Sequence, residues 1–249
     1  DKLTPRVKQT AKLLWGIYVG FVLLETLILK IEGLAWFDAL CHSFGTMATG
    51  GFSTNTASIG AYGDIVQWTI IFFMLCAATN FSLHYYFIAK GNMNYWKDRE
   101  FTVYFSLIMV CAVLFFISIV NTDTYSFNFD TIRHSFFTSI SLITTTGFAT
   151  EDFANWPAMS KVLVFFLFFI GGSAGSTTGG MKIIRLILVF KYLIYEVYKL
   201  LHPKGVFNIK INNTAIKDDV VRATLGFYLF YIFIFVFTAI VLSFTGLDV

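Results

Sequence analysis

Charge is scarce in this sequence. Asp, Glu, Lys and Arg make up 13% of the 249 residues, whereas soluble globular domains carry about 25%. Proline and cysteine are also rare, with three residues each. Cys41, Cys76 and Cys111 show no metal-ligand spacing, so we interpret them as packing residues or free thiols. The shortage of charge argues against a water-soluble domain.

Signatures of enzymatic chemistry are absent from the sequence as well. We find no nucleophile with an aligned base, no cluster of metal ligands and no Walker-type phosphate loop. The segment GGSAGSTTGG lacks the Gly-Lys-Ser/Thr ending that such a loop requires. We therefore expect a chain that is not an enzyme and that carries no organic cofactor.

Apolar residues dominate instead: 57% of the chain is hydrophobic, and 30 residues are phenylalanine. Runs of about 20 apolar residues predict membrane-spanning helices. We place such spans at roughly 11–31, 64–90, 100–121, 156–201 and 220–244. The fourth is about twice as long as a bilayer requires, so we expect it to be broken.

Charge placement orients these spans. If the N-terminus is cytoplasmic and each span crosses once, all but three of the 18 Lys and Arg residues lie inside; the exceptions are Lys30, Arg133 and Lys161. An excess of Lys and Arg marks cytoplasmic loops. We therefore expect a multi-pass protein of the plasma (inner) membrane, with the N-terminus of this chain in the cytoplasm. The first dozen residues lack a small-residue cleavage site, so we expect no cleaved signal peptide.

The predicted outer loops are acidic, with Glu32, Asp38, Asp64, Asp123, Asp130, Glu151 and Asp152. An acidic outer mouth would concentrate cations and repel anions. The alternative is that acidic residues are merely tolerated on the outside. The sequence leaves both interpretations open.

Two outer connections resemble each other. The first reads FDALCHSFGTMATGGFSTN from Phe37, and the second reads FDTIRHSFFTSISLITTTGFATED from Phe129. Both begin Phe-Asp, continue to His-Ser-Phe and end Thr-x-Gly-Phe-x-Thr. The second has about four additional residues, or one helical turn, so we expect a short helix that is one turn longer. The unit of span, short helix, Thr/Gly loop and span occurs twice, as in architectures built around a symmetry axis.

The Thr/Gly loops are candidate filter loops. They consist of Thr49, Gly50, Gly51 and Phe52, and of Thr145, Thr146, Gly147 and Phe148. Irregular backbone at membrane depth is tolerated only when it is buried or lines a cavity. Rings of backbone carbonyls can replace the hydration shell of a monovalent cation, and glycine lets the backbone approach an ion. The alternative is that both are ordinary glycine-containing turns at the outer surface. Because the two loops occupy equivalent positions in the repeat, we favour the filter.

The break expected in the fourth span is a glycine-rich segment made of Gly171, Gly172, Ser173, Ala174, Gly175, Ser176, Thr177, Thr178, Gly179 and Gly180. Each glycine costs about 1 kcal/mol in a helix relative to alanine. We expect a loop below the second filter loop, in the permeation path, that can move aside to open a gate. The alternative is a close-packing helix face of small residues. It is disfavoured because the small residues here are consecutive and not spaced four apart. Lys182 and Arg185 follow the segment and face either its cavity or the headgroups.

Several ionisable residues lie inside the apolar stretches. Glu25 is a functional candidate by its position in a span, although it could simply pair with Lys30. His42 and His134 recur at matching positions of the repeat, and we favour packing over a place in the outer vestibule. For His84 we favour a hydrogen-bonded structural role over a proton relay.

Four stretches carry a family likeness: LTPRVKQTAK, FDALCHSFGTMATGGFST, TTTGFATEDFANWP and GGSAGSTTGGMKIIR. Together they resemble the Trk/Ktr/HKT superfamily of potassium transporters, most closely its bacterial TrkH branch, over essentially the whole chain. The resemblance implies an all-α membrane protein of four helix–pore helix–filter loop–helix units of potassium-channel type around a pseudo-four-fold pore. Residues 1–91 would then be the second unit and 92–215 the third, with its second helix broken at 171–180. Residues 216–249 would be the first helix of the fourth.

The resemblance also implies the activity. It is selective potassium transport across the plasma membrane, with the glycine-rich segment as the gate and Gly51 and Gly147 in the filter-glycine positions. The transported K+ would be bound by four backbone carbonyls, those of Thr49, Gly50, Thr145 and Thr146. A sodium- or proton-coupled cation carrier of the same fold stays open. A membrane-embedded enzyme that uses His42, His134 or Glu25 is a more remote alternative.

Partners are implied by the same resemblance. They are a second copy of the protein in a homodimer, and cytoplasmic nucleotide-binding regulatory subunits of the TrkA/KtrA type. We expect a lipid bilayer around the chain and no nucleic acid. The basic segment from Lys182 to Arg222 is a docking face for the regulatory subunits or touches anionic lipid.

Overall fold

The computed structural model describes residues 3–91, 95–122, 127–202, 208–212 and 214–245. It divides into two compact units, Asp1–Ile183 and Ile184–Val249, which we describe separately. Lys2, Asp123 and Lys204, which entered the charge argument, lie outside the described residues, as does the predicted repeat boundary at residue 92.

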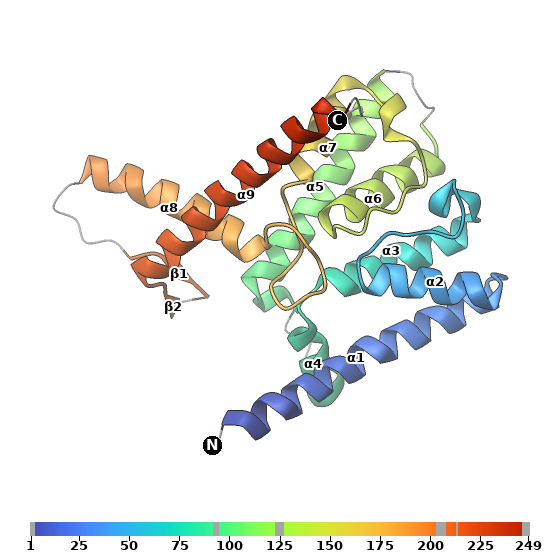
Figure 1. Cartoon of the computed structure of the whole chain (residues 1–249), viewed down its shortest axis with the longest axis horizontal. Coiled ribbons are helices and arrows are strands. Elements are labelled where there is room, and N and C mark those ends of the chain that lie inside the picture. Colours follow the sequence, from blue (N-terminus) through green and yellow to red (C-terminus); the bar gives the residue numbers. More distant parts are fainter. Residues whose placement is uncertain (1–2, 92–94, 123–126, 203–207, 213, 246–249) are drawn as a thin grey trace. The chain divides into compact units, whose positions relative to one another are not determined.

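The first unit repeats one order of elements. α1 (Leu3–Ile31) is followed by the short helix α2 (Trp36–Met47), the 3-10 turn η1 (Ser58–Ala61), α3 (Asp64–Ala78) and α4 (Phe81–Lys90). After η2 (Tyr95–Lys97) come α5 (Arg99–Asn121), the short helix α6 (Phe129–Ile143), η3 (Phe153–Asn155) and α7 (Ala158–Leu167). In Figure 1, α2 lies along α1, and α6 lies beside α5. These elements confirm the predicted all-α fold with repeated units.

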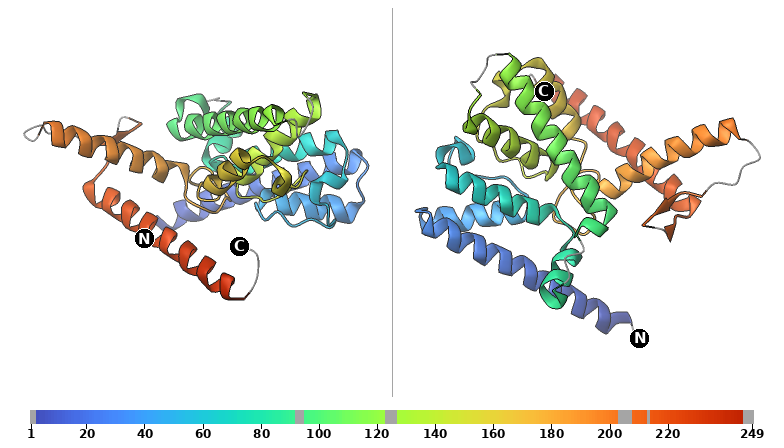
Figure 2. Two further views of the ribbon diagram at one scale, coloured as in Figure 1. Left: turned by 90° about the horizontal axis from the view of Figure 1, so that it is seen from above. Right: turned by 180° about the vertical axis from the view of Figure 1, so that it is seen from behind.

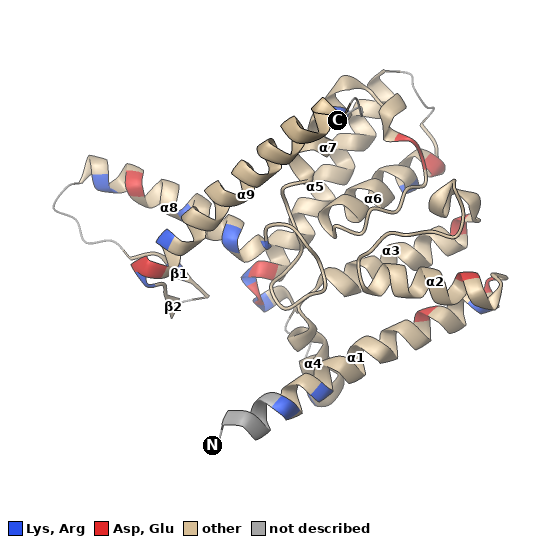
Figure 3. Ribbon diagram, viewed as in Figure 1, with Lys and Arg blue, Asp and Glu red and all other residues tan. Residues whose placement is uncertain are grey.

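Several helices have the length and composition of membrane spans. Within the described residues there are three, namely Lys8–Ile31 of α1, α5 and α9 (Asp218–Phe244), or four if α3 and α4 form one bent span. α7 is a shorter apolar helix. Figure 3 shows the charged residues mostly near helix ends, with α5 uncharged over most of its length. This distribution is the one expected of helices surrounded by lipid.

The second predicted span, 64–90, is not one straight helix. α3 and α4 are bent by 98° at a short break between them. The side-chain oxygen of Asn80 accepts a hydrogen bond from the N–H of Ser82 at 2.9 Å, the role for which asparagine is favoured at a helix N-terminus. The predicted span at 64–90 is therefore bent, because Asn80 starts a new helix inside the apolar stretch.

The fourth predicted span is broken where the sequence indicates. α7 ends at Leu167, and α8 (Ile183–Leu201) begins after the glycine-rich segment. The N–H of Gly171 donates to the carbonyl of Met181 at 2.7 Å, which closes the base of the segment. The segment is therefore a loop held at both ends, and the alternative of a small-residue helix face does not apply.

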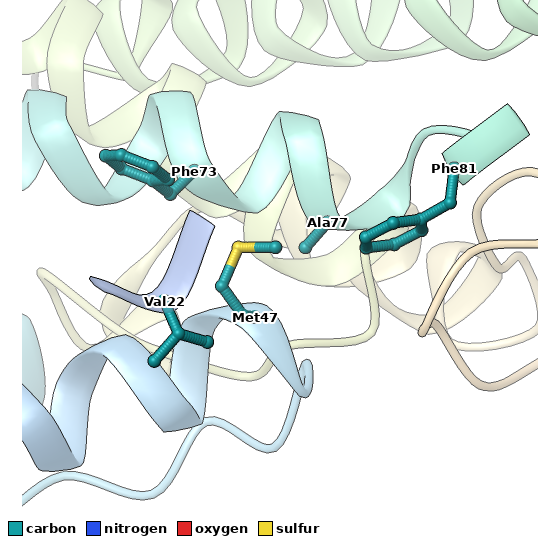
Figure 4. Close-up of a cluster of buried hydrophobic side chains, with 5 residues drawn as sticks. All are labelled: Val22, Met47, Phe73, Ala77 and Phe81. Carbon is teal, nitrogen blue, oxygen red and sulfur yellow. The ribbon is translucent and has the colours of Figure 1, made fainter. Parts of the chain in front are cut away.

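A buried cluster fixes the end of the short helix α2. Val22, Met47, Phe73, Ala77 and Phe81 pack together, as Figure 4 shows. They come from α1, α2, α3 and α4, so the helix is held on several sides. Because lipid tails are as apolar as these side chains, the cluster stabilises the helices through close van der Waals packing. The first candidate filter loop thus starts from a rigid position.

Arg133, near the N-terminal end of the short helix α6, joins the two repeats. Its guanidinium is buried; Nε donates to Gln67 at 2.8 Å, and Nη1 lies 2.9 Å from Asp64 and 2.8 Å from Asp130. Gln67 and Asp64 belong to α3, so the guanidinium holds α6 of one repeat against α3 of the other. A buried charge needs such partners to offset its desolvation.

The second unit contains α8 after its first residue, an antiparallel hairpin of β1 (Lys210–Ile211) and β2 (Thr214–Ala215), and α9. Figure 2 shows α8 in orange and α9 in red. The guanidinium of Arg185 lies 4.0 Å from the ring centre of Phe227, a cation–π distance. This contact joins α8 to α9, and the fifth predicted span lies within α9.

We predict that Met47→Ala lowers the free energy of unfolding by about 2–5 kcal/mol, because it empties a fully buried position between several helices. Unfolding of the purified protein in detergent by heat or denaturant measures the loss. The control is Ile65→Ala, on α3 at a position that is 71% exposed, with an expected change within about 0.5 kcal/mol. Equal losses in the two variants would contradict this description of the core.

Candidate functional site

The two candidate filter loops share an uncommon backbone. Thr49 and Thr145 have φ angles of 51° and 53°, and Gly51 and Gly147 have φ angles of 67° and 85°. A positive φ is uncommon for a residue other than glycine, and such strain tends to gather at functional sites. Two segments far apart in the sequence thus adopt the same succession of backbone conformations.

Their hydrogen bonds match as well. In the first loop, the N–H groups of Gly50 and Gly51 both donate to the carbonyl of Gly45, at 2.8 and 3.3 Å. In the second loop, the N–H groups of residues 146 and 147 donate to the carbonyl of Ser141, at 3.0 and 3.3 Å. Each loop therefore folds back onto the last turn of its own short helix.

These bonds fix the direction of the loop carbonyls. In a trans peptide, the N–H group and the preceding carbonyl lie in one plane and point in opposite directions, and the described residues contain no cis peptide. Because the N–H groups turn toward the short helices, the preceding carbonyls point away from them. These carbonyls are those of Thr49, Gly50, Thr145 and Thr146, the four predicted from the sequence to bind a cation.

The second filter loop packs directly on the first. A Cβ on Gly51 would lie 1.8 Å from the carbonyl oxygen of Thr146, so a side chain has no room there. The Phe148 side chain is only 3% exposed, and its ring would lie 3.1 Å from a Cβ on Gly45. Glycine at positions 45 and 51 therefore allows the close approach of the two loops.

The corresponding outer edges of the pair are open. Phe52, the counterpart of Phe148, is 85% exposed. A Cβ built on Gly147, the counterpart of Gly51, has no described atom within 4 Å. Phe148 and Gly51 therefore lie where the two repeats meet. Their counterparts, Phe52 and Gly147, lie on faces that no other described repeat covers.

The two histidines of the repeat are not equivalent in space. α6 has 15 residues and α2 has 12, which confirms the predicted extra turn. The extra residues displace His134 by a turn, so that it bonds to Thr150 at 2.9 Å, whereas Asp38 bonds to the matching Thr54 at 2.7 Å. His42 is fully buried behind the first loop. Asp38, and not His42, is thus the counterpart of His134.

The glycine-rich segment contacts both filter loops through their threonines. The hydroxyl of Thr49, which donates to the carbonyl of Ala48 at 2.7 Å, also lies 3.2 Å from the carbonyl of Thr177. The hydroxyl oxygen of Thr145 accepts from the N–H of Gly179 at 2.7 Å. The segment therefore lies against the same end of both loops.

The segment is anchored in the break between α3 and α4. The N–H of Ser173 donates to the carbonyl of Ala78 at 2.9 Å, and the N–H of Phe81 donates to the carbonyl of Gly175 at 3.1 Å. The hydroxyl of Thr177 donates to the carbonyl of Ala77 at 3.1 Å. A helix break leaves such backbone groups without helical partners, and the segment supplies them.

Two charged side chains also hold the segment. Glu100, buried in the first turn of α5, accepts from the N–H of Ala174 at 2.7 Å. The ammonium of Lys182 donates to the hydroxyl of Thr178 at 2.9 Å. Lys182 therefore faces the segment, one of the two positions predicted for it. The role of Glu100 was missed, although an acidic residue at the end of an otherwise apolar span is a signal that could have found it.

The predicted pair of Glu25 and Lys30 does not form. Lys30 donates to the carbonyl of Leu34 at 3.1 Å and lies over the ring of Trp36. Glu25 is fully buried, and neither carboxyl oxygen has a hydrogen-bond partner among the described residues. His84 is hydrogen-bonded at both ring nitrogens, in agreement with a structural role.

Oxygen atoms are the ligands that this region offers to a cation. Among the residues that the structure describes, no group of three or more His, Cys, Asp or Glu side chains could hold a metal ion. Backbone carbonyls and threonine hydroxyls gather at the two filter loops instead. Such neutral oxygens suit a weakly bound ion that has to leave again.

Comparisons with known proteins identify the family and the fold of the chain. The chain matches the TrkH family model, described as a cation transport protein, over residues 1–248. The Trk system potassium uptake protein TrkH of Escherichia coli (strain K12) is 39% identical over 254 residues, covering 100% of this chain and 52% of that protein. TrkG of the same strain, also a Trk system potassium uptake protein, is 33% identical over 251 residues, covering 100% and 51%.

A solved structure is similar over the whole chain. The crystal structure of the potassium transporter TrkH from Vibrio parahaemolyticus matches with a TM-score of 0.92 at 37% identity, covering 100% of this chain and 54% of that one. The chain thus spans about half the length of the curated relatives it matches.

We predict unequal costs for removing the two filter-loop phenylalanines from this 249-residue chain. Phe148→Ala should lower the free energy of unfolding by about 3–5 kcal/mol, because the ring is buried against the first repeat. Phe52→Ala, at the exposed counterpart, should cost less than about 1 kcal/mol. Denaturant unfolding in detergent compares the two. Equal costs would show that the second loop does not pack on the first as described.

Proposed function

The chain belongs to the TrkH family of cation transport proteins, and we propose that it supplies two of four repeats of a potassium-selective pore. The observation that carries this proposal is the pair of filter loops with matching dihedrals, matching hydrogen bonds and four carbonyls turned away from the short helices. Carbonyl oxygens held by the protein replace the hydration shell of K+. K+ is the transported ion, bound at Thr49, Gly50, Thr145 and Thr146.

The open edges of the pair support a ring of more than two repeats. Phe148 covers Gly45 of the neighbouring repeat, whereas Phe52 has no such neighbour in the described chain. In a four-fold ring, each phenylalanine would cover the short helix of the repeat before it. We assign residues 1–91 to the second of the four repeats, 92–215 to the third and 216–249 to the first helix of the fourth. Two loops do not close a pore, so conduction requires the other repeats.

The glycine-rich segment is the gate in this proposal. It contacts the threonines at one end of both filter loops and contains no large side chain. A segment that is held by hydrogen bonds, without a packed apolar core of its own, can leave its place at modest cost. Movement of residues 171–180 would open the path below the filter.

Surroundings and partners follow from the family. We propose a multi-pass protein of the plasma (inner) membrane, with the N-terminus of this chain in the cytoplasm. It forms a homodimer and docks cytoplasmic nucleotide-binding subunits of the TrkA/KtrA type through the basic stretch from Lys182 to Arg222. The Trk system names of the relatives support a multi-component uptake system.

One observation favours a second candidate function. Glu25 is a fully buried carboxyl without a hydrogen-bond partner among the described residues, and ionisable groups inside a membrane often mark proton pathways. An ion-coupled carrier of the same fold would use such a group. Loss of pH-dependent flux in Glu25→Gln would favour the carrier, and unchanged pH dependence would favour the simple pore.

We predict that Gly147→Ser in the complete four-repeat transporter lowers the K+/Na+ permeability ratio by about tenfold, equivalent to about 1.4 kcal/mol. The reason is that a side chain strains the loop at a φ of 85° and moves the filter carbonyls. Cation flux into liposomes measures the ratio. Gly91→Ser is the control, since Gly91 also has a positive φ, 62°, but lies at the end of α4. An unchanged ratio in Gly147→Ser would contradict the filter assignment.

We also predict that deletion of residues 175–177 produces a leaky transporter. The deletion removes the acceptor for the N–H of Phe81 and the contact between Thr177 and Thr49. Flux without regulatory subunits should rise by at least about tenfold, because the deletion removes two hydrogen bonds and each contributes about 0.5–1.5 kcal/mol. Radioactive rubidium or potassium flux in liposomes tests it; flux equal to that of the wild type would refute the gate.

A further inference from the structure

Lys182 lies two residues after the glycine-rich segment, and its side chain turns back onto it. Its half-buried ammonium donates to the carbonyl oxygen of Thr178, to the hydroxyl of Thr178 at 2.9 Å and to the hydroxyl of Ser176 at 3.5 Å. A lysine at a membrane boundary commonly extends to the headgroups. This one instead places its charge among the oxygens of the segment.

The oxygens around the ammonium are held in place by the segment itself. The hydroxyl of Ser176 donates to the carbonyl of Ser173 at 2.5 Å and lies 2.8 Å from the hydroxyl of Thr178. The N–H of Gly172 donates to the same Thr178 hydroxyl at 3.1 Å. Two of the three oxygens around the ammonium are thus also held by bonds within the segment, which lowers the entropic cost of binding a cation there.

Taking the gate proposed above as its premise, the geometry points to a site for a monovalent cation in the glycine-rich segment, filled by the tethered ammonium of Lys182. An ammonium group and K+ carry the same charge, and both bind to carbonyl and hydroxyl oxygens. While the ammonium is bound, residues 176–178 are held in their turn. When it leaves, the turn loses its cation and the segment is released.

The site is connected to the filter by one peptide. Thr178 binds the ammonium, and the next residue, Gly179, donates its N–H to the hydroxyl of Thr145. The carboxylate of Glu100 accepts a hydrogen bond from the N–H of Ala174 in the same segment. Its negative charge favours a cation nearby. Lys182 is therefore a positioning residue, which acts on the filter through the turn that it fills.

Chemical rescue tests this site in the complete transporter, reconstituted in liposomes without regulatory subunits. Lys182→Ala removes the ammonium and leaves a space for a small one. We expect the K+ leak to rise about tenfold, as for loss of a charge-assisted hydrogen bond. Millimolar n-propylammonium chloride on the segment's side should return the leak toward the wild-type value. Tetramethylammonium chloride, with the same charge but no N–H donor, should not.

Controls separate this inference from the proposed function. Lys161→Ala, an exposed lysine on α7, should leave the leak unchanged. Ser176→Ala removes one oxygen of the site and should give a smaller increase in leak. Should Lys182→Ala not yield folded protein, Lys182→Met keeps the bulk of the stem and should leak without rescue.

The outcomes are distinct. A wild-type transporter without K+ flux overturns the proposed function. A K+-selective wild type whose Lys182→Ala variant does not leak overturns the cation site alone. A leak that tetramethylammonium suppresses as well as propylammonium does, or that neither suppresses, also overturns it.

Discussion

Backbone polar groups at membrane depth must find partners within the protein, and this constraint organises the first unit. Two of its apolar stretches are broken, between α3 and α4 and between α7 and α8. Each break frees N–H and carbonyl groups, and the two sets satisfy each other: Ser173 bonds to Ala78, and Phe81 bonds to Gly175. The irregular segment of one repeat therefore requires the kink in the other.

The filter loops obey the same constraint in another way. Their N–H groups return to the short helices, so their carbonyls are left for a ligand. Their threonine hydroxyls bond to the glycine-rich segment at Thr177 and Gly179. Because the loops and the segment share hydrogen bonds, the segment cannot move without changing the environment of both loops. If the loops are the filter and the segment is the gate, as we propose, this coupling gives a physical reason for their adjacent positions.

Several charged residues have structural partners within the first unit. Asp64 and Asp130 bind the buried guanidinium of Arg133, and Asp38 accepts a hydrogen bond from Thr54. These three acidic residues, expected from the sequence to form part of an outer mouth, thus have structural partners. The buried carboxylate of Glu100 and the half-buried ammonium of Lys182 hold the glycine-rich segment. Desolvation is offset in each of these places by a hydrogen bond or an opposite charge.

Local pattern was sufficient for much of the fold and of the site. Apolar runs predicted the spans, ten small residues in succession predicted the loop at Gly171–Gly180, and the Thr-x-Gly-Phe repeat located two loops that share their backbone geometry. These features depend on hydropathy and on the conformational freedom of glycine, which are properties of short segments. The bend at Asn80 was missed because a single cap inside an apolar run is a weak signal.

Other features were decided by contacts between distant segments. Counting from Phe37 and Phe129 pairs His42 with His134 in the sequence, but the longer α6 makes Asp38 the spatial counterpart. The sequence contains the motifs, the charge balance and the places where helices end. Only the tertiary structure decided that the backbone groups of the α3–α4 break bond to the glycine-rich segment. It also decided that Phe148 is buried while Phe52 is open, and that Lys182 turns to the segment. Each of these features depends on where a second segment lies in space.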